Sequence, residues 1–496
     1  MGSSAIFLPF SHKHERDKCW SWEKWLKKAA NKSENDLNTW LSDEFVPCTS
    51  FSSLTLKPYI AAINNQFYVE VEHNKDGGLT FETNEKPVWF AKVIKVAGYR
   101  LLCRWIGADL ATDSRAKSDF WIHIASTEIH RIGECNPMKK KDYTYRPPAF
   151  ITRKWKADLM GNIAKHVNDL ADADTFSDDF ELAKQRTATN KFEKGQRVEL
   201  LSAQNCIRPA RITKIKGRRI QLEVREDEVP APELEKNEID AQYGADAVYW
   251  IDEDSFMLFY VGWASLNKYK LVANQSYIKH AKKIAEAIKE DKEPPYEKID
   301  VRMETMLRKK KNEKGEFKKG MKLELFDPLD QKMKYLHVAT ITKILKNGYL
   351  LVQGGDETED EALPLHWTSP YLFPCGYSAQ YNVPIIHPEL NESLVTDFDW
   401  PTYLKKTNAV AAPEHLFAEF NAKEIARKFP IGSRLEAADN NELMKIYPAT
   451  VAGVHGRLLL IHYVQYGEDY DQIYDYRSND LFPVGFTEMY NHPLIK

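Results

Sequence analysis

The sequence contains few cysteines and no cluster of metal-binding side chains. Its 496 residues include six cysteines, which lie far apart, form no Cys-x-x-Cys pair and have no histidine neighbour at ligand spacing. A structural zinc site needs such a cluster, and a disulfide framework needs more cysteines in a shorter chain. We therefore expect no metal, free thiols and a reducing compartment. The six are Cys19, Cys48, Cys103, Cys135, Cys206 and Cys375.

Long hydrophobic runs are also missing. No stretch approaches the ~20 apolar residues that a membrane-spanning helix needs. The apolar run within residues 1–10 is too short for a secretory signal, and Ile6 breaks the myristoylation pattern. The net charge of −3 gives no overall attraction to nucleic acid or membranes, so any polyanion contact needs a local patch. These features predict a soluble intracellular protein with no membrane partner.

Motifs that carry catalysis are missing as well. The chain has no Gly-x-Ser-x-Gly elbow, no glycine-rich phosphate loop and no His-Glu-x-x-His pair, and its fourteen histidines are dispersed. An active site needs a nucleophile, a base or a metal within reach of one another. The sequence therefore predicts a protein that is not an enzyme and that uses no cofactor.

What the chain does contain is a fourfold internal repeat. Its length suggests about three or four domains, and three landmarks recur in one order at a period of roughly 110–130 residues. The first is a turn entering a strand that ends in glutamate, the second a glycine between two β-type runs, and the third a Ser-x-x-(Ile/Leu) segment ending in glycine. The landmarks lie at 63–70, 192–199, 317–324 and 429–436; at Gly98, Gly217, Gly348 and Gly456; and at 126–133, 255–262, 369–376 and 478–485.

A helical arm precedes each strand-rich core. Residues 399–406 have an aspartate placed to cap a helix and a proline in its first turn, and residues 21–28 share their register. Amphipathic patterns predict further helices over 155–167 and 277–288. Glycine turns between β-type runs predict hairpins, so the expected fold is mainly β with helical arms. The four units are predicted at 20–147, 148–272, 273–388 and 389–496.

The combination of these motifs resembles the malignant-brain-tumour (MBT) repeat family, over nearly the whole chain from about Trp20 to Pro493. The resemblance implies four tandem MBT repeats, each a helical arm plus a small tudor-like β-barrel core packed against a neighbour's arm. It also implies a nuclear chromatin regulator that reads methylated lysine on histone tails and acts in transcriptional repression. The motifs that carry it lie at Gly320–Pro328, Gly98–Leu102, Asp119–Trp121 and Ser126–Gly133, together with the arms.

The fourth unit carries a candidate aromatic cage. Tyr463, Tyr466 and Tyr470 follow its glycine hairpin, and Asp439 follows its glutamate strand. Aromatic faces attract a methylated ammonium, and a carboxylate accepts the N–H that an incompletely methylated amine retains. Mono- or dimethyl-lysine is therefore favoured over trimethyl-lysine. The same spacing is also typical of a buried helix face, but the β-type run and Gly467 argue against a helix.

The other three units lack this combination. Residue types at the aromatic and acidic positions are mixed, and Asp327, which precedes a proline, fits a turn. Because truncating a buried aromatic costs about 3–5 kcal/mol, a set that three copies do without is better explained as a binding site than as core. The aromatic positions hold Trp105, Ala108 and Thr112; Val224, Asp227 and Ala231; and Gly355, Thr358 and Ala362, and the acidic ones His73, Ser202 and Asp327.

Two alternative functions fit the sequence. The repeats can form a protein-interaction scaffold of a repressive chromatin complex without methyl-lysine binding, which needs no cage. Basic runs at Arg308–Lys311 and Lys139–Lys141 can contact nucleic acid weakly, which would make binding depend on salt and not on methylation. The expected partners are thus a methylated histone tail peptide and other chromatin proteins.

Overall fold

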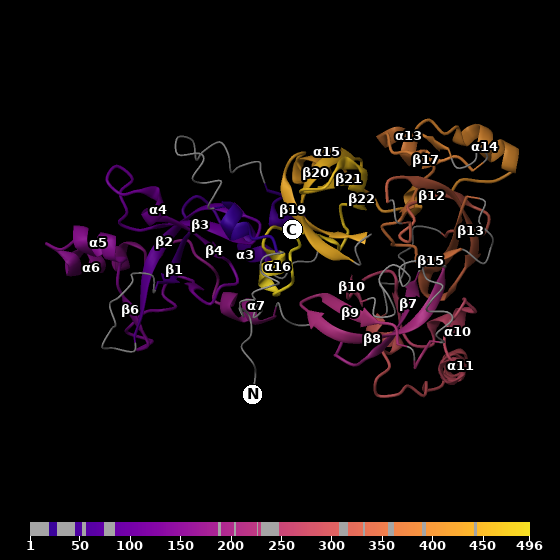
Figure 1. Cartoon of the computed structure of the whole chain (residues 1–496), viewed down its shortest axis with the longest axis horizontal. Coiled ribbons are helices and arrows are strands. Elements are labelled where there is room, and N and C mark those ends of the chain that lie inside the picture. Colours follow the sequence, from indigo (N-terminus) through magenta and orange to yellow (C-terminus); the bar gives the residue numbers. More distant parts are fainter. Residues whose placement is uncertain are drawn as a thin grey trace.

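The computed structural model contains four antiparallel sheets that follow one another along the chain (Figure 1). In each sheet five strands take the same order, in which three hairpin-connected neighbours follow the first strand and a short fifth strand pairs with its other edge. The four predicted repeats are therefore present as four β cores. The structure describes residues 19–26, 45–51, 56–73, 85–186, 190–202, 205–225, 227–229, 248–306, 316–330, 333–355, 362–388, 393–440 and 444–496.

The strands of the four cores have the following bounds. The first core contains β1 (Tyr68–Glu72), β2 (Lys86–Ala97), β3 (Arg100–Trp105), β4 (Asp119–His123), β5 (Ile129–His130) and β6 (Tyr143–Tyr145). The second contains β7 (Arg197–Ser202), β8 (Cys206–Lys216), β9 (Arg219–Glu223), β10 (Val248–Asp252) and β11 (Leu258–Phe259). The third contains β12 (Lys322–Leu325), β13 (Leu336–Ile344), β14 (Tyr349–Gly354), β15 (Leu363–His366), β16 (Leu372–Phe373), β17 (Ile385–Ile386) and β18 (Leu394–Val395). The fourth contains β19 (Arg434–Asp439), β20 (Lys445–His455), β21 (Leu458–Tyr463), β22 (Gln472–Asp475) and β23 (Leu481–Phe482).

Short helices connect and flank these cores. Residues 22–26 are helical near the N-terminus. The first and second units contain η1 (Cys48–Ser50), α3 (Lys57–Ala61), α4 (Arg115–Ser118), α5 (Ala149–Lys154), α6 (Leu159–Asp169), α7 (Phe180–Arg186) and α10 (Trp263–Asn267). The third and fourth contain α11 (Gln275–Lys289), α12 (Met303–Met306), η2 (Lys346–Gly348), α13 (Tyr377–Tyr381), α14 (Trp400–Thr407), η4 (Glu414–Leu416), α15 (Ala422–Lys428), η6 (Glu468–Tyr470) and α16 (Phe486–Met489).

The predicted glycine hairpins are confirmed in all four cores. Each turn glycine has a positive φ, between 57° at Gly217 and 81° at Gly348, which disfavours side chains other than glycine. The long second strand of every core also has a register shift at the same point, for example between Val451 and Gly453. A bulge bends the strand and increases its twist, so each sheet curls into a small half-barrel.

The strand glutamate of the first landmark connects three parts of each repeat. Glu436 is fully buried and accepts hydrogen bonds from the backbone N–H groups of Gly485 (2.7 Å) and Thr487 (2.9 Å), in and beside the third landmark. It also accepts one from Trp22 Nε1 (2.9 Å). Glu70, Glu199 and Glu324 are equally buried and accept equivalent pairs of backbone bonds. The first and third landmarks recur together because the glutamate of the first accepts hydrogen bonds from the backbone in and beside the third.

Each glutamate also accepts a hydrogen bond from one further side chain. In the first core this is Tyr145, on β6 of the same core (2.7 Å). Tyr277, in the arm helix α11, donates to the glutamate of the second core at 3.1 Å, and Trp400, in the arm helix α14, to that of the third at 2.7 Å. Trp22, in the N-terminal arm, donates to the glutamate of the fourth core. The first and last described segments of the chain therefore meet, and the Trp20 backbone N–H donates to the Leu494 carbonyl (2.8 Å).

The predicted arms are present as helices in the residues that the structure describes; residues 27 and 28 of the first arm lie outside them. Helix α14 is capped by Asp399, which accepts from Thr402 N–H, and α11 extends the predicted 277–288 helix by a few residues. The helix predicted over 155–167 begins later than expected, because α5 ends at Lys154 and α6 spans Leu159–Asp169. Asp158 caps α6 by accepting from Gly161 N–H, and an N-cap residue is not helical itself.

The second, third and fourth cores lie around a common centre, and the first extends from the far side of the fourth (Figure 1). Buried arginines after the hairpin glycines connect them. Arg457 of the fourth core donates to backbone carbonyls of the third at 2.8 and 2.9 Å, and Arg219 of the second donates to the Met444 carbonyl of the fourth at 3.0 Å. Arg100 of the first core pairs with Glu488 of the fourth at 2.7 Å.

Candidate functional site

The candidate residues of the fourth repeat come from three elements of one core. Asp439 ends β19, Tyr463 ends β21, and Tyr470 ends η6, the short turn that connects β21 to β22. Tyr466 lies in the turn just after β21, where Gln465 has a positive φ of 78° and Tyr466 N–H donates to the Tyr463 carbonyl. The acid and the aromatic residues are thus positioned by different elements of the core.

Tyr463 does not form an open wall of the site. Its side chain is 1% exposed, and its hydroxyl lies 2.9 Å from the Ala438 carbonyl and 3.0 Å from the Tyr474 hydroxyl. Burial raises the pKa of Tyr463 well above its usual value. The expectation that all three rings face an open slot is therefore not met at this position. Tyr463 packs as a core residue below the other two rings.

Tyr466 and Tyr470 extend from this core to the surface. Tyr447, on β20, lies between the buried and the exposed rings, with ring centroids 5.9 Å from Tyr463 and 5.5 Å from Tyr466. Tyr466 is half-buried and lies 5.6 Å from Tyr470, whose side chain is 56% exposed. All three contacts are edge-to-face, so successive rings turn their faces in different directions. The result is an aromatic patch that begins in the core and ends in solvent.

Asp439 belongs to the same network through Gln472. The carboxylate is 6% exposed and accepts a hydrogen bond from Gln472 Nε2 at 2.7 Å. Gln472 Oε1 lies 3.1 Å from the Tyr463 hydroxyl and 2.6 Å from the Tyr474 hydroxyl. The acid and the floor of the aromatic patch are therefore connected by one buried amide.

The third repeat supports the loop that carries the exposed ring. Lys334 donates to the carbonyls of Asp469 (2.7 Å) and Glu468 (3.1 Å), both within η6. Ile473 N–H, just after the loop, donates to the Met333 carbonyl at 2.7 Å. The site of the fourth repeat therefore depends on contacts with its neighbour.

Sequence reasoning missed Tyr447, Gln472 and Tyr474. Counting from the hairpin glycine reaches Tyr463 reliably, because β20 and β21 form a tight hairpin. It does not reach β22, since the loops before that strand differ between repeats. The strand register pairs Gln472 with Ile461, and the hydrogen bond from Gln472 Nε2 to Asp439 places it beside the acid.

The corresponding positions of the first repeat form a different site. Trp105 stacks on Phe120 with centroids 4.2 Å apart, and His73 takes the place of the acid. Both line a cleft of about 570 Å³ between the first core and α5. Two of the acids that line the cleft are paired: Asp119 accepts from Arg104 at 2.6 Å and Glu72 from Lys86 and His130. A third, Glu128, is exposed at the edge of the cleft. The position that corresponds to Asp439 is thus held by a histidine and not by an acid.

The second and third repeats also lack an open aromatic patch at these positions. Val224 and Ala362 are buried in the core. Asp327 accepts from Leu329 N–H at 2.7 Å, which confirms that it is a turn residue. Ala231 and Thr358 lie outside the described residues. The internal comparison therefore assigns aromatic patch and acid together to the fourth repeat, within the part of the chain that the structure describes.

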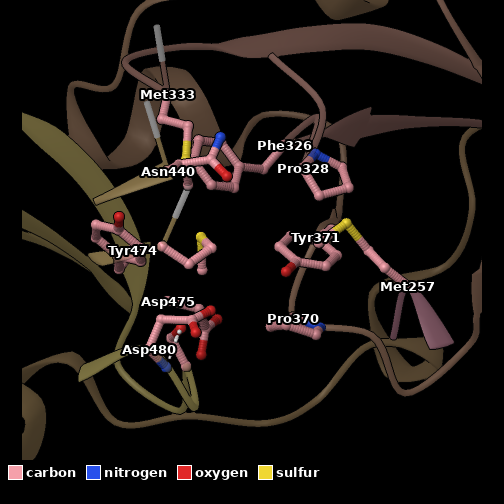
Figure 2. A pocket seen from close by; sticks show the side chains of 12 residues that line it. Met257, Phe326, Pro328, Met333, Pro370, Tyr371, Asn440, Tyr474, Asp475 and Asp480 are labelled. Carbon is pink, nitrogen blue, oxygen red and sulfur yellow. Dashed lines mark hydrogen bonds between the residues drawn. The ribbon is translucent and has the colours of Figure 1, made fainter. Parts of the chain in front are cut away.

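A second pocket lies where the second, third and fourth repeats meet (Figure 2). Tyr371 and Met257 face Tyr474, Asp475 and Asp480 across it. Its volume of about 20 Å³ is close to that of one water molecule. The carboxylates are also engaged by the buried arginines, Asp475 by Arg457 and Asp480 by Arg219. This pocket is too small for a lysine side chain.

Other charged clusters carry no comparable site. Among the described residues, His280, Glu297 and Asp300 lie close enough to hold a metal ion, but Arg197 already pairs with both acids. The basic run Arg308–Lys311 lies outside the described residues, and Lys140 pairs with Glu134. No helix within the described ranges is both long and apolar enough to cross a bilayer.

The fold and the aromatic patch define a class of protein: a tandem array of four small tudor-like β cores that exchange helical arms. The MBT repeat model matches residues 81–149, 196–278, 321–392 and 433–496, which together cover more than half of the sequence. The chain therefore belongs to the MBT repeat family, as the sequence motifs indicate.

Known relatives and a solved structure share this organisation. The chain is 32% identical to Protein lin-61 of Caenorhabditis elegans, over 95% of this chain and 78% of that protein. It is 29% identical to Polycomb protein Sfmbt of Drosophila melanogaster, over 86% of this chain and 33% of that protein. A crystal structure of the four MBT repeats of Drosophila Sfmbt in complex with the peptide RHR(me)KVLR superposes with a TM-score of 0.73, at 26% identity and over 97% of this chain and 99% of that one.

Proposed function

We propose that this protein is a nuclear chromatin reader that binds methylated lysine on histone tails through its fourth repeat and acts in transcriptional repression. The observation that carries the proposal is the aromatic patch that ends in half-buried Tyr466 and exposed Tyr470 and is connected to the buried acid Asp439 through Gln472. The complex of the Sfmbt repeats with a methylated lysine peptide and the Polycomb name of that relative support it. The protein acts by binding and not by catalysis.

The binding mechanism follows from the geometry of the patch. The methylammonium contacts the rings of Tyr466 and Tyr470, each of which contributes about 0.5–2 kcal/mol. Tyr463 and Tyr447 support these rings from below. Asp439 accepts the N–H that mono- and dimethyl-lysine retain, in a charge-assisted hydrogen bond. Trimethyl-lysine has no such proton, so lower methylation states are preferred.

The expected affinity for an isolated peptide is weak. Two aromatic rings, of which only Tyr470 is exposed, and one hydrogen bond offset only part of the association cost, so the Kd is on the order of micromolar to near millimolar. In the cell, neighbouring repeats and other chromatin proteins would add contacts to the same assembly.

Peptide titration tests this function. Histone tail peptides carrying unmodified, monomethyl-, dimethyl- or trimethyl-lysine are titrated against the wild-type chain and against Tyr470→Ala. We expect methylated peptides to bind more tightly than unmodified ones, and the difference to shrink in the variant. Trp105→Ala, in the first repeat, is the matched aromatic control. Equal binding of all peptides by the wild-type chain would instead favour the scaffold function.

A further inference from the structure

Gln472 makes an unusual set of contacts for a strand residue. It begins β22, is 1% exposed, and uses both ends of its side-chain amide. The Nε2 group donates to Asp439 Oδ1 at 2.7 Å. The Oε1 atom lies within hydrogen-bond distance of two tyrosine hydroxyls and of the Asn440 backbone N–H, the last at 3.2 Å. This amide therefore has several partners, all of them in the fourth core.

These partners allow only one orientation of the amide. Turning it over would place the NH₂ group against the Asn440 N–H, which is also a donor, and the amide oxygen against the Asp439 carboxylate. Both contacts would be repulsive, because a carboxylate accepts and does not donate. The Tyr463 and Tyr474 hydroxyls have two protons between them for two acceptors, the Ala438 carbonyl and Gln472 Oε1. The network thus fixes Nε2 toward Asp439.

The other repeats have no amide at this place in the sheet. In the fourth core Gln472 pairs with Ile461, five residues after the hairpin glycine. The residues at the same distance from the glycine pair with Phe120 in the first core and with Tyr249 in the second. In the third core, Ala362 directly precedes the equivalent strand. The amide therefore occurs only in the repeat that has both the acid and the aromatic patch.

We propose that Gln472 is the positioning residue that sets methylation-state selectivity, by fixing the plane of the Asp439 carboxylate beside the aromatic patch. This inference rests on the proposed function of the fourth repeat. A carboxylate offers about four lone-pair directions, so its orientation decides where it accepts. With Gln472 donating to Oδ1, the direction in which Asp439 accepts a ligand N–H is set before the ligand arrives. Pre-organisation of this kind lowers the cost of binding.

Removing the amide donor tests this role. Gln472→Met has nearly the same shape but no donor, and Gln472→Asn keeps an amide but withdraws it by about 1.5 Å. The affinities of dimethyl- and trimethyl-lysine peptides are measured for both variants and for the wild-type chain. We expect dimethyl affinity to fall about tenfold, as for loss of a hydrogen bond to a charged group, while trimethyl affinity changes less than about twofold. The ratio of the two then approaches one.

Two controls separate positioning from a general structural effect. Gln221→Met removes a similar amide from β9 of the second core, where it bonds Thr213, and is expected to leave the ratio unchanged. In an Asp439→Asn background, Gln472→Met is expected to change the ratio no further, because it acts through the carboxylate. A further change in that background would contradict the proposed route.

The possible outcomes are distinguishable. A wild-type chain that binds methylated and unmodified peptides equally would remove the proposed function and this inference with it. The inference alone would be overturned if the wild-type chain prefers methylated peptides but the Gln472 variants keep the wild-type ratio of dimethyl to trimethyl affinity. Variants that lose both affinities equally would overturn it in the same way. If Gln472→Met does not fold, the Gln472→Asn variant decides.

Discussion

The N-terminal arm is predicted to stabilise the last repeat, although the two lie at opposite ends of the sequence. Trp22 is fully buried and donates to Glu436, 414 residues away. Trp22→Phe keeps a ring of similar packing but removes the indole N–H. Removing one partner of a buried hydrogen bond costs about 1–3 kcal/mol, so the fourth core is expected to lose stability of that order. Trp22→Ala also removes a buried aromatic, which costs about 3–5 kcal/mol in total.

Hydrogen exchange gives the suitable assay, because a four-repeat chain does not unfold in one step. The backbone amides of Gly485 and Thr487, which donate to Glu436, should exchange faster in Trp22→Phe. The amides of β19, the strand that carries Glu436, should do the same. The amides of β12, whose Glu324 receives Trp400, provide the internal reference. Faster exchange confined to the first repeat, with β19 unchanged, would refute the exchange of arms between the chain ends.

Three further predictions concern the repeat interfaces and the site. Burial lowers the pKa of His123, which contacts the Gly485 carbonyl, to about 4 from its usual 6.5. The unfolded chain therefore binds the proton first as pH falls. The contribution of this side chain to stability is complete above pH 6.5 and is lost as pH falls toward 4, by about 1.4 kcal/mol at pH 5.5. Denaturation of His123→Gln should show a weaker acid dependence, and an identical one would contradict this. Lys334→Met should weaken methyl-lysine binding about threefold by loosening η6, measured by the same titration, and unchanged affinity would show that the loop is rigid without it. Trp105→Ala should leave methyl-lysine affinity within about twofold while reducing the stability of the first core by about 2–4 kcal/mol, and a large loss of affinity would move the site to the first repeat.

The fold could be predicted from the sequence because its landmarks are local. A glycine with positive φ between two β-type runs specifies a hairpin without reference to the rest of the chain, and Asp399 before Trp400 specifies a helix start. The strand glutamate was recognised as a landmark, but its role was not. That role depends on a loop 49 to 65 residues later and, in three of the four cores, on an arm from another repeat, neither of which local sequence reveals.

The site was predicted only in part, for a related reason. Tyr466 and Tyr470 lie in contact with one another after β21, and Asp439 is connected to the same aromatic patch through Gln472. The burial of Tyr463 was not foreseen, because position in the sequence does not show that Tyr474 and Gln472 cover its hydroxyl. Residues that act through strand pairing, such as Gln472, become visible only with the register of the sheet.

The central claim is that the fourth repeat selects methylated lysine through an acid beside its aromatic patch. Asp439→Asn tests it most directly, because the variant keeps the shape of the side chain but removes its charge and replaces one accepting oxygen with an NH₂ donor. Calorimetric titration of a dimethyl-lysine histone peptide should show at least a tenfold loss of affinity relative to wild type, with the trimethyl-lysine peptide much less affected. Equal affinities of the wild-type protein and Asp439→Asn for the dimethyl-lysine peptide would contradict the account.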